Sequence, residues 1–112
     1  MRKAERLTRS SQFAAVFKQG KGWAGGLMVL RAMPNGLEFS RFGFIASKKV
    51  GNAVVRNRVR RVLREVVRLT PIEPGWDIVI IARREAAGAH YHDISSALIG
   101  LLGRAGILRE DG

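Results

Sequence analysis

The chain has 112 residues, 46% of them hydrophobic, which suits a single folded domain over residues 1–112 with a real core. It contains no cysteine, which excludes disulfides, thiolate metal sites and cysteine nucleophiles. The net charge is +11, and residues 41–70 dominate it with nine basic side chains against one acidic. A field of this sign attracts nucleic acid or an anionic membrane surface. No apolar run reaches the length of a membrane span or a signal segment, so we expect a cytoplasmic protein that does not enter a membrane.

The first half of the chain predicts one helix and two strands. Residues 10–20 indicate a short helix with a serine N-cap and a glycine at its end. The glycine-rich residues 21–26 are typical of a turn, and residues 27–33 of a strand. The Pro-Asn-Gly sequence at 34–36 predicts a hairpin turn, and alternation over 37–47 predicts a long second strand.

The second half predicts a basic loop over 48–53, an arginine-rich helix over 54–70 and a central strand over 77–82. A turn over 86–91 then leads to an amphipathic helix from residue 92 or 93 to about 104. The predicted order is α-β-β-α-β-α. We therefore expect an α+β sandwich on a small mixed sheet.

Arginines recur at every fourth position of the second predicted helix, at Arg56, Arg60, Arg64 and Arg68. At about 100° per residue they fall within an arc of roughly 120°, with Asn57 and Arg61 on or beside it and valines opposite. Like charges at this spacing repel by roughly 0.2–0.5 kcal/mol per pair, and the helix holds only one acid, Glu65. Solvated helix faces usually mix both signs, so the imbalance favours contact with phosphates, which the guanidinium fork matches well.

Residues 47–61 read SKKVGNAVVRNRVRR, and this run resembles the signature of the protein subunit of bacterial ribonuclease P. Arg56-Asn57-Arg58 stands where that family has its arginine-asparagine-arginine motif. The likeness extends to residues 13–20, to the strand from Leu27 and to residues 80–83. It implies a subunit of the endonuclease that removes the 5′ leader from precursor transfer RNA (tRNA), in which a large RNA is the catalyst. It also implies a left-handed β-α-β crossover.

The resemblance implies two RNA-binding surfaces. One binds the catalytic RNA through Lys48, Lys49, Asn52, Arg56, Asn57, Arg58, Arg60, Arg61, Arg64 and Arg68. The other holds the single-stranded leader in a cleft between the first helix and the sheet, through Phe13, Phe17, Arg31, Lys48, Arg83 and Arg84. Arg31 stands where many members of the family carry an aromatic residue, and arginine can stack or pair with phosphate. Phenylalanines four residues apart are also typical of a core, so both interpretations of Phe13 and Phe17 stay open.

The nine acidic residues are scattered, and no Ser-His-Asp set stands out, so we expect no catalytic residue in the polypeptide. His90 and His92 flank Tyr91 without an evident third ligand, which indicates a polar turn rather than a metal site. The family resemblance implies Mg²⁺ held mainly by the catalytic RNA and the substrate. The protein would raise substrate affinity and lower the Mg²⁺ requirement, with no further protein partner needed.

Two other hypotheses remain. A general module for structured RNA, of ribosomal or chaperone type, would bind any such RNA equally and ignore the 5′ leader. A free-standing nuclease would cleave RNA without a catalytic RNA, which the scattered acids argue against.

Overall fold

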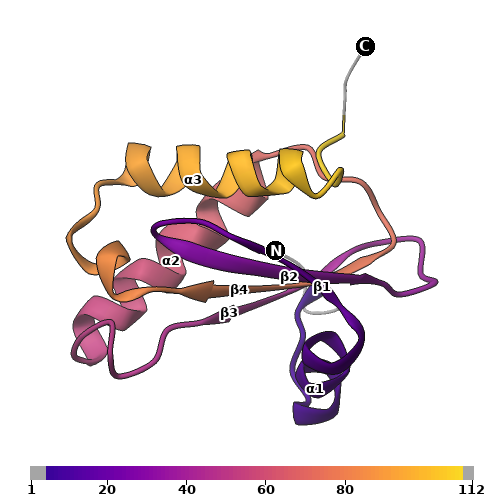
Figure 1. Cartoon of the computed structure of the whole chain (residues 1–112), viewed down its shortest axis with the longest axis horizontal. Coiled ribbons are helices and arrows are strands. Elements are labelled where there is room, and N and C mark those ends of the chain that lie inside the picture. Colours follow the sequence, from indigo (N-terminus) through magenta and orange to yellow (C-terminus); the bar gives the residue numbers. More distant parts are fainter. Residues whose placement is uncertain (1–4, 110–112) are drawn as a thin grey trace.

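The computed structural model describes residues 5–109, in which a four-stranded mixed sheet has helices on both faces (Figure 1). The elements in chain order are α1 (Ser10–Gln19), β1 (Lys21–Ala24), β2 (Met28–Pro34), β3 (Arg41–Ile45), α2 (Ala53–Leu69), β4 (Trp76–Ala82), the 3₁₀-helix η2 (Arg84–Gly88) and α3 (Tyr91–Arg104). The spatial order of strands is β1-β2-β4-β3, and β3 runs parallel to β4 with α2 as the crossover. The α+β class is confirmed, and the left-handed sense of the crossover stays a prediction.

The sheet separates a large core from a small one. Side chains of β2 alternate, so that Met28, Leu30 and Ala32 are buried in the large core, into which α2 and α3 also pack. On the other face α1 covers the small cluster of Leu7, Val16 and Val79 (Figure 1). β4 pairs with β2 on one side and β3 on the other, as expected of the predicted central strand. Most of its apolar run is buried, because α1 covers one face of the sheet and α2 and α3 cover the other.

Three predictions about the first strands are wrong. The glycine-rich segment after α1 is not a turn but strand β1, which pairs antiparallel with β2. Pro34 to Gly36 do not connect neighbouring strands, because β4 lies between β2 and β3. The predicted long strand over 37–47 shortens to Arg41–Ile45. Seven residues of β2 pair with β4, and this long-range pairing excludes the local hairpin.

The predicted serine N-cap of α1 is also wrong, because the helix begins at Ser10 with Arg9 in the cap position. The Gln12 side chain satisfies this end instead: its Oε1 accepts hydrogen bonds from the backbone N–H groups of Thr8 and Arg9, at 2.8 and 2.9 Å. The predicted stop at Gly20 is confirmed. Among residues 5–109, no helix combines the length and apolarity needed to cross a membrane.

Candidate nucleic-acid interface

Helix α2 is amphipathic in the predicted sense. Val59, Leu63, Val66 and Val67 are buried, and the arginines project from the remaining surface. Asn52 is the N-cap, and its Oδ1 accepts a hydrogen bond from the backbone N–H of Val55 at 3.0 Å. The helix ends at Leu69, and Pro71 follows within two residues. The same local pattern therefore sets the length of α2 and the side from which the guanidinium groups project.

We call Arg56, Arg60, Arg64 and Arg68 the arginine row. The row lies along β3, one of the two edge strands of the sheet. Arg60 donates a long hydrogen bond of 3.4 Å to the carbonyl of Ala46, just after β3. The Cζ of Arg64 lies 5.8 Å from the centroid of the Phe44 ring, which is a cation–π distance. Arg61 is exposed, and so is Asn57, whose Oδ1 accepts a hydrogen bond from Arg60. These contacts orient the row without neutralising its charge.

One arginine of α2 has an acidic partner within the described residues. Arg68 donates to the carboxylate of Glu65 at 2.6 Å, in a pair that is about half exposed. The hydrogen bond from Arg68 holds the pKa of Glu65 below its ordinary value, and the same bond raises the pKa of Arg68. Exposed pairs of this kind contribute little to stability. The helix therefore keeps an open cationic face.

Two of the residues predicted to bind RNA, Arg56 and Arg58, have guanidinium groups that are partly buried or bonded within the protein. The Nη2 of Arg58 donates to the carbonyl of Ala87 at 2.7 Å and ties α2 to η2. The Nε of Arg56 is buried without a hydrogen-bond partner. Within the arginine-asparagine-arginine motif, Arg58 therefore contacts η2, Asn57 is exposed and Arg56 is partly buried. The RNA contacts of the motif stay a prediction.

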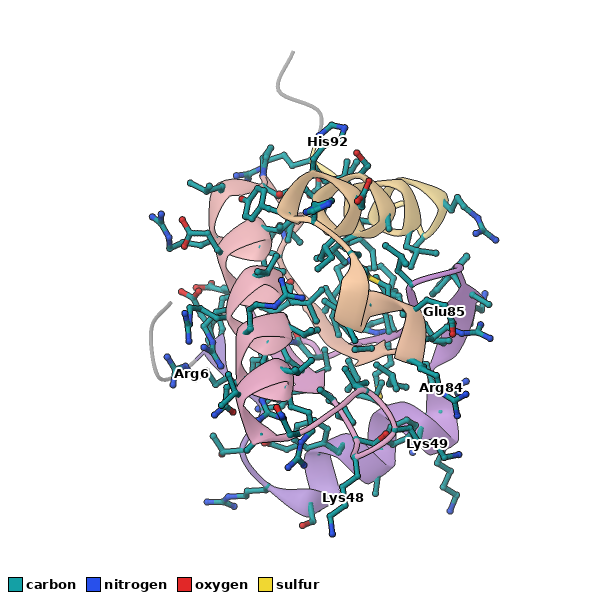
Figure 2. The ribbon with its side chains drawn as sticks, turned by 90° about the vertical axis from the view of Figure 1, so that its left-hand side faces the viewer. Arg6, Lys48, Lys49, Arg84, Glu85 and His92 are labelled. Atoms are coloured by element: carbon teal, nitrogen blue, oxygen red, sulfur yellow. The ribbon has the colours of Figure 1, made fainter. Side chains whose placement is uncertain are left out.

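Four basic side chains gather where β3 and β4 end, and we call this set the basic edge: Lys48, Lys49, Arg83 and Arg84. Parallel strands end at the same edge of a sheet, which brings the two sequence-distant pairs together. All four are exposed, and Figure 2 shows the labelled members at one end of the molecule. Arg83 also donates to the carbonyl of Gly25 at 3.2 Å. Of these four, Lys48, Arg83 and Arg84 were predicted for the leader-binding site and Lys49 for the catalytic-RNA surface, so the basic edge joins residues of both predicted surfaces.

The two phenylalanines of α1 have different surroundings. Phe13 is half-buried in the small core and lies so close to the backbone of Gly43 that a side chain at 43 would overlap its ring. Phe17 is 42% exposed and offers an open ring. Sequence reasoning missed Gly43, although an isolated glycine in a strand often marks such a close approach. Phe13 therefore packs in the small core and also lines a small cavity beside β3, whereas Phe17 has the more exposed ring; leader contacts of both stay a prediction.

Arg31 contacts the end of α1. Its Nη2 donates to the carbonyls of Phe17 and Gly20, both at 2.8 Å, and its Nε is buried without a partner. The guanidinium runs past Gly22, its cross-strand neighbour in β1, where a Cβ would lie 3.1 Å from Nη1. These bonds satisfy carbonyls that the helix end leaves open. A leader contact of Arg31 stays a prediction.

The described residues do not fit a protein-held metal site. No group of three or more His, Cys, Asp or Glu side chains lies together in residues 5–109. His92 is exposed at the start of α3, and His90 occupies the N-cap position of that helix (Figure 2). The predicted turn over 86–91 is therefore only partly correct, because η2 extends to Gly88 and α3 already begins at Tyr91, which places His92 within the helix.

The chain is similar to known proteins over nearly its whole length. The family model described as Ribonuclease P matches residues 1–106. The chain belongs to the ribonuclease P protein family. It is 48% identical over 108 residues to the ribonuclease P protein component of Dehalococcoides mccartyi, covering 96% of this chain and 90% of the relative. It is 44% identical over 112 residues to that of Roseiflexus castenholzii, covering 97% and 92%.

Solved ribonuclease P proteins share the fold. A Staphylococcus aureus structure matches with a TM-score of 0.87 and 32% identity, over 96% of this chain and all of the other. One from Thermotoga maritima matches with a TM-score of 0.79 and 31% identity, over 89% and 96%. This ribonuclease P protein is an auxiliary subunit of the endoribonuclease that matures the 5′ end of tRNA, and it works with the ribonuclease P RNA and the tRNA substrate. The first of the three hypotheses is therefore confirmed.

Proposed function

We propose that this subunit binds the catalytic RNA along α2 and the single-stranded 5′ leader on the opposite face of the sheet. The catalytic-RNA surface comprises the arginine row with Asn57, Arg58 and Arg61, and Lys48, Lys49 and Asn52 continue it at the start of the helix. The leader surface comprises three members of the basic edge and three residues beside them: Lys48, Arg83, Arg84, Phe13, Phe17 and Arg31. Figure 1 shows α1 and α2 on different faces, so both RNAs can be bound together.

The observation that carries the proposal is the open charge of α2. Six arginines stand on this helix, and within the described chain one of them has an acidic partner. The like charges of such a surface repel one another, and a bound polyanion offsets this repulsion. Arginine contacts to phosphate give affinity and register with little base specificity. We assign the arginine row this role.

On the leader side, the exposed Phe17 ring can stack on a base while the basic edge contacts phosphates. Screening of phosphate repulsion by the protein lowers the Mg²⁺ concentration needed for cleavage. The proposal assigns the ions to the catalytic RNA and the substrate, and the whole reaction to the cytoplasm.

Reconstitution with purified catalytic RNA at low Mg²⁺ tests this assignment. The double variant Arg60→Ala/Arg64→Ala should bind that RNA more weakly, with the slope of log affinity against log salt reduced by roughly two. Cleavage of precursor tRNA at low Mg²⁺ should fall in parallel, because fewer subunits are bound.

The matched control is Lys21→Ala/Arg104→Ala. It removes two positive charges from β1 and α3, away from the β3 edge. Its salt slope should equal that of the unmodified protein. An unchanged slope in the α2 variant would refute the assignment. Cleavage by the polypeptide without any catalytic RNA would refute the prediction that it is not itself catalytic.

A further inference from the structure

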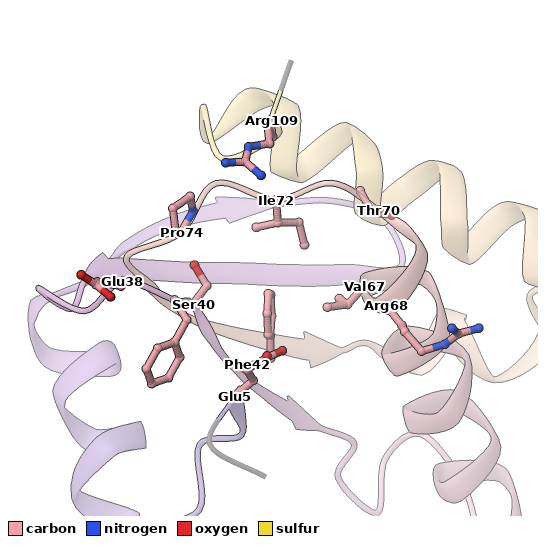
Figure 3. Close-up of a pocket in the computed structure, with 11 residues that line it drawn as sticks. Glu5, Glu38, Ser40, Phe42, Val67, Arg68, Thr70, Ile72, Pro74 and Arg109 are labelled. Carbon is pink, nitrogen blue, oxygen red and sulfur yellow. The ribbon is translucent and has the colours of Figure 1, made fainter. Parts of the chain in front are cut away.

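A cavity of about 410 Å³ lies at the C-terminal end of α2, where the loop into β4 passes over β3 (Figure 3). Its volume is within the range of roughly 300–1,000 Å³ that is usual for small-ligand sites. Val67 and Ile72 contribute apolar wall, and the Phe42 side chain rises from the sheet below them (Figure 3). Of the residues assigned to the two proposed RNA surfaces, only Arg68 of the arginine row lines this cavity.

The cavity presents aromatic surface. Phe42 is nearly fully buried, and its ring is parallel to that of Phe44 at 6.4 Å between centroids, so the floor is held in place. Phe39 also lines the cavity and is 37% exposed. It lies in the segment before β3, where the sequence predicted a strand that would have paired it into a sheet. Nucleobases can stack on a partly exposed ring such as that of Phe39, while the buried Phe42 ring forms the floor beside it.

Two basic and two acidic side chains line the cavity, so its charges balance and do not favour a phosphate as the open face of α2 does. Arg68, the last member of the arginine row, lines the cavity together with Arg109. Glu5 and Glu38 line it as well, and their carboxylates repel a phosphate that enters. An RNA backbone that runs along α2 can therefore place its phosphates at the arginines and turn an uncharged base into the cavity. Carboxylates accept hydrogen bonds from exocyclic amino groups, which adenine, cytosine and guanine carry and uracil lacks.

We propose that this cavity binds one unpaired, amino-bearing base of the catalytic RNA. The proposal rests on the assignment of the arginine row to that RNA. Phe42 and Val67 belong to the face that packs on α2, whereas the leader surface is across the sheet. The occupant is thus a nucleotide of the catalytic RNA and not one of the leader.

The test compares Phe39→Ala with Leu37→Ala in complexes with the full-length catalytic RNA. Leu37 is 39% exposed in the same segment and does not line the cavity, so it controls for loss of exposed apolar surface. Base-specific chemical probing should show one unpaired adenine, cytosine or guanine that the unmodified protein and Leu37→Ala protect and Phe39→Ala leaves reactive. Affinity should fall roughly 5- to 100-fold in Phe39→Ala with an unchanged salt slope, because stacking carries no charge.

Two further measurements define the site. Changing the protected nucleotide to uridine should weaken binding of the unmodified protein and have little added effect on Phe39→Ala. Glu38→Gln, at an exposed position, should reduce the preference over uridine while the protein stays folded. This second variant keeps the test decisive if Phe39→Ala folds poorly.

Several results would overturn the cavity assignment. One is normal binding with no base whose protection depends on Phe39, and another is a dependent base that lies in the precursor tRNA. A third is equal affinity for uridine and the amino-bearing base. None of these results contradicts the assignment of the arginine row to the catalytic RNA. Failure of that assignment would appear separately, as an unchanged salt slope in Arg60→Ala/Arg64→Ala.

Discussion

Arg31 illustrates how a single basic side chain can serve protein structure at a nucleic-acid surface. Its guanidinium joins β2 to the last turn of α1 through two bonds to backbone carbonyls. One of these carbonyls belongs to Phe17, the residue that offers the open ring. Arg31 therefore positions the aromatic group of the proposed leader surface, whether or not it also meets a phosphate.

Replacing Arg31 with alanine should lower the free energy of unfolding by about 1.5–3 kcal/mol, the usual contribution of hydrogen bonds from a charged group. Chemical denaturation measures this change, and Phe17→Ala is the comparison. Phe17→Ala should be nearly as stable as the unmodified protein but bind a long-leader precursor more weakly than its leaderless counterpart. If Arg31→Ala kept full stability and instead reduced the salt slope of leader binding by about one, Arg31 would be a phosphate ligand.

The beginning of α2 combines a structural cap with a predicted RNA surface. Asn52 accepts the hydrogen bond from Val55 that an uncapped helix would lack. The preceding Gly51 has a φ of 154°, and a Cβ there would lie 3.0 Å from Val55, so the loop enters the helix in a conformation that suits glycine. The direction in which the arginine row points depends on this loop and cap, because a rotation of α2 about its axis would move all four side chains together.

Asn52→Ala should therefore lower the stability of the free protein by about 1 kcal/mol, and Asn52→Asp should retain it, since aspartate caps equally well. Thermal unfolding of the two variants provides the comparison. Equal stability of Asn52→Ala and the unmodified protein would contradict the capping role. Weaker binding of the catalytic RNA by Asn52→Asp at full stability would show that this position also faces a phosphate.

Across the whole molecule, one sheet connects the two proposed RNA surfaces, and a buried carboxylate holds its strands together. Asp77 of β4 accepts two hydrogen bonds from Arg41 of β3, at 2.7 and 2.8 Å, and a third from Asn35 after β2. It is 5% exposed, and its hydrogen bonding raises the pKa of Arg41. This network links three strands that local sequence signals alone do not bring together.

Asp77→Ala should destabilise the protein by about 3 kcal/mol, because it leaves Arg41 and Asn35 without their partner at a buried position. Glu85→Ala removes an exposed acid at the start of η2 and should change stability by less than about 0.5 kcal/mol. Urea unfolding of both variants tests the difference. A small effect of Asp77→Ala would mean that the sheet does not depend on this network.

Local pattern was sufficient for the features that repeat over short distances. The arginine row, the buried side of α2 and the central strand β4 follow from periodicity and composition, because neighbouring residues fix which way a helix or strand faces. The run over 47–61 was specific enough to indicate the family, which the comparisons confirm. The predicted individual contacts to RNA remain predictions.

Only the tertiary structure decided the strand order, the existence of β1, the separation of Phe13 from Phe17 and the partners of Arg31. Each depends on contacts between segments far apart in the chain. β4 lies between β2 and β3 because its long apolar run buries more surface there than a local hairpin would. That insertion brings the basic edge together, and the folding of the chain after Gly36 leaves Phe39 beside the end of α2.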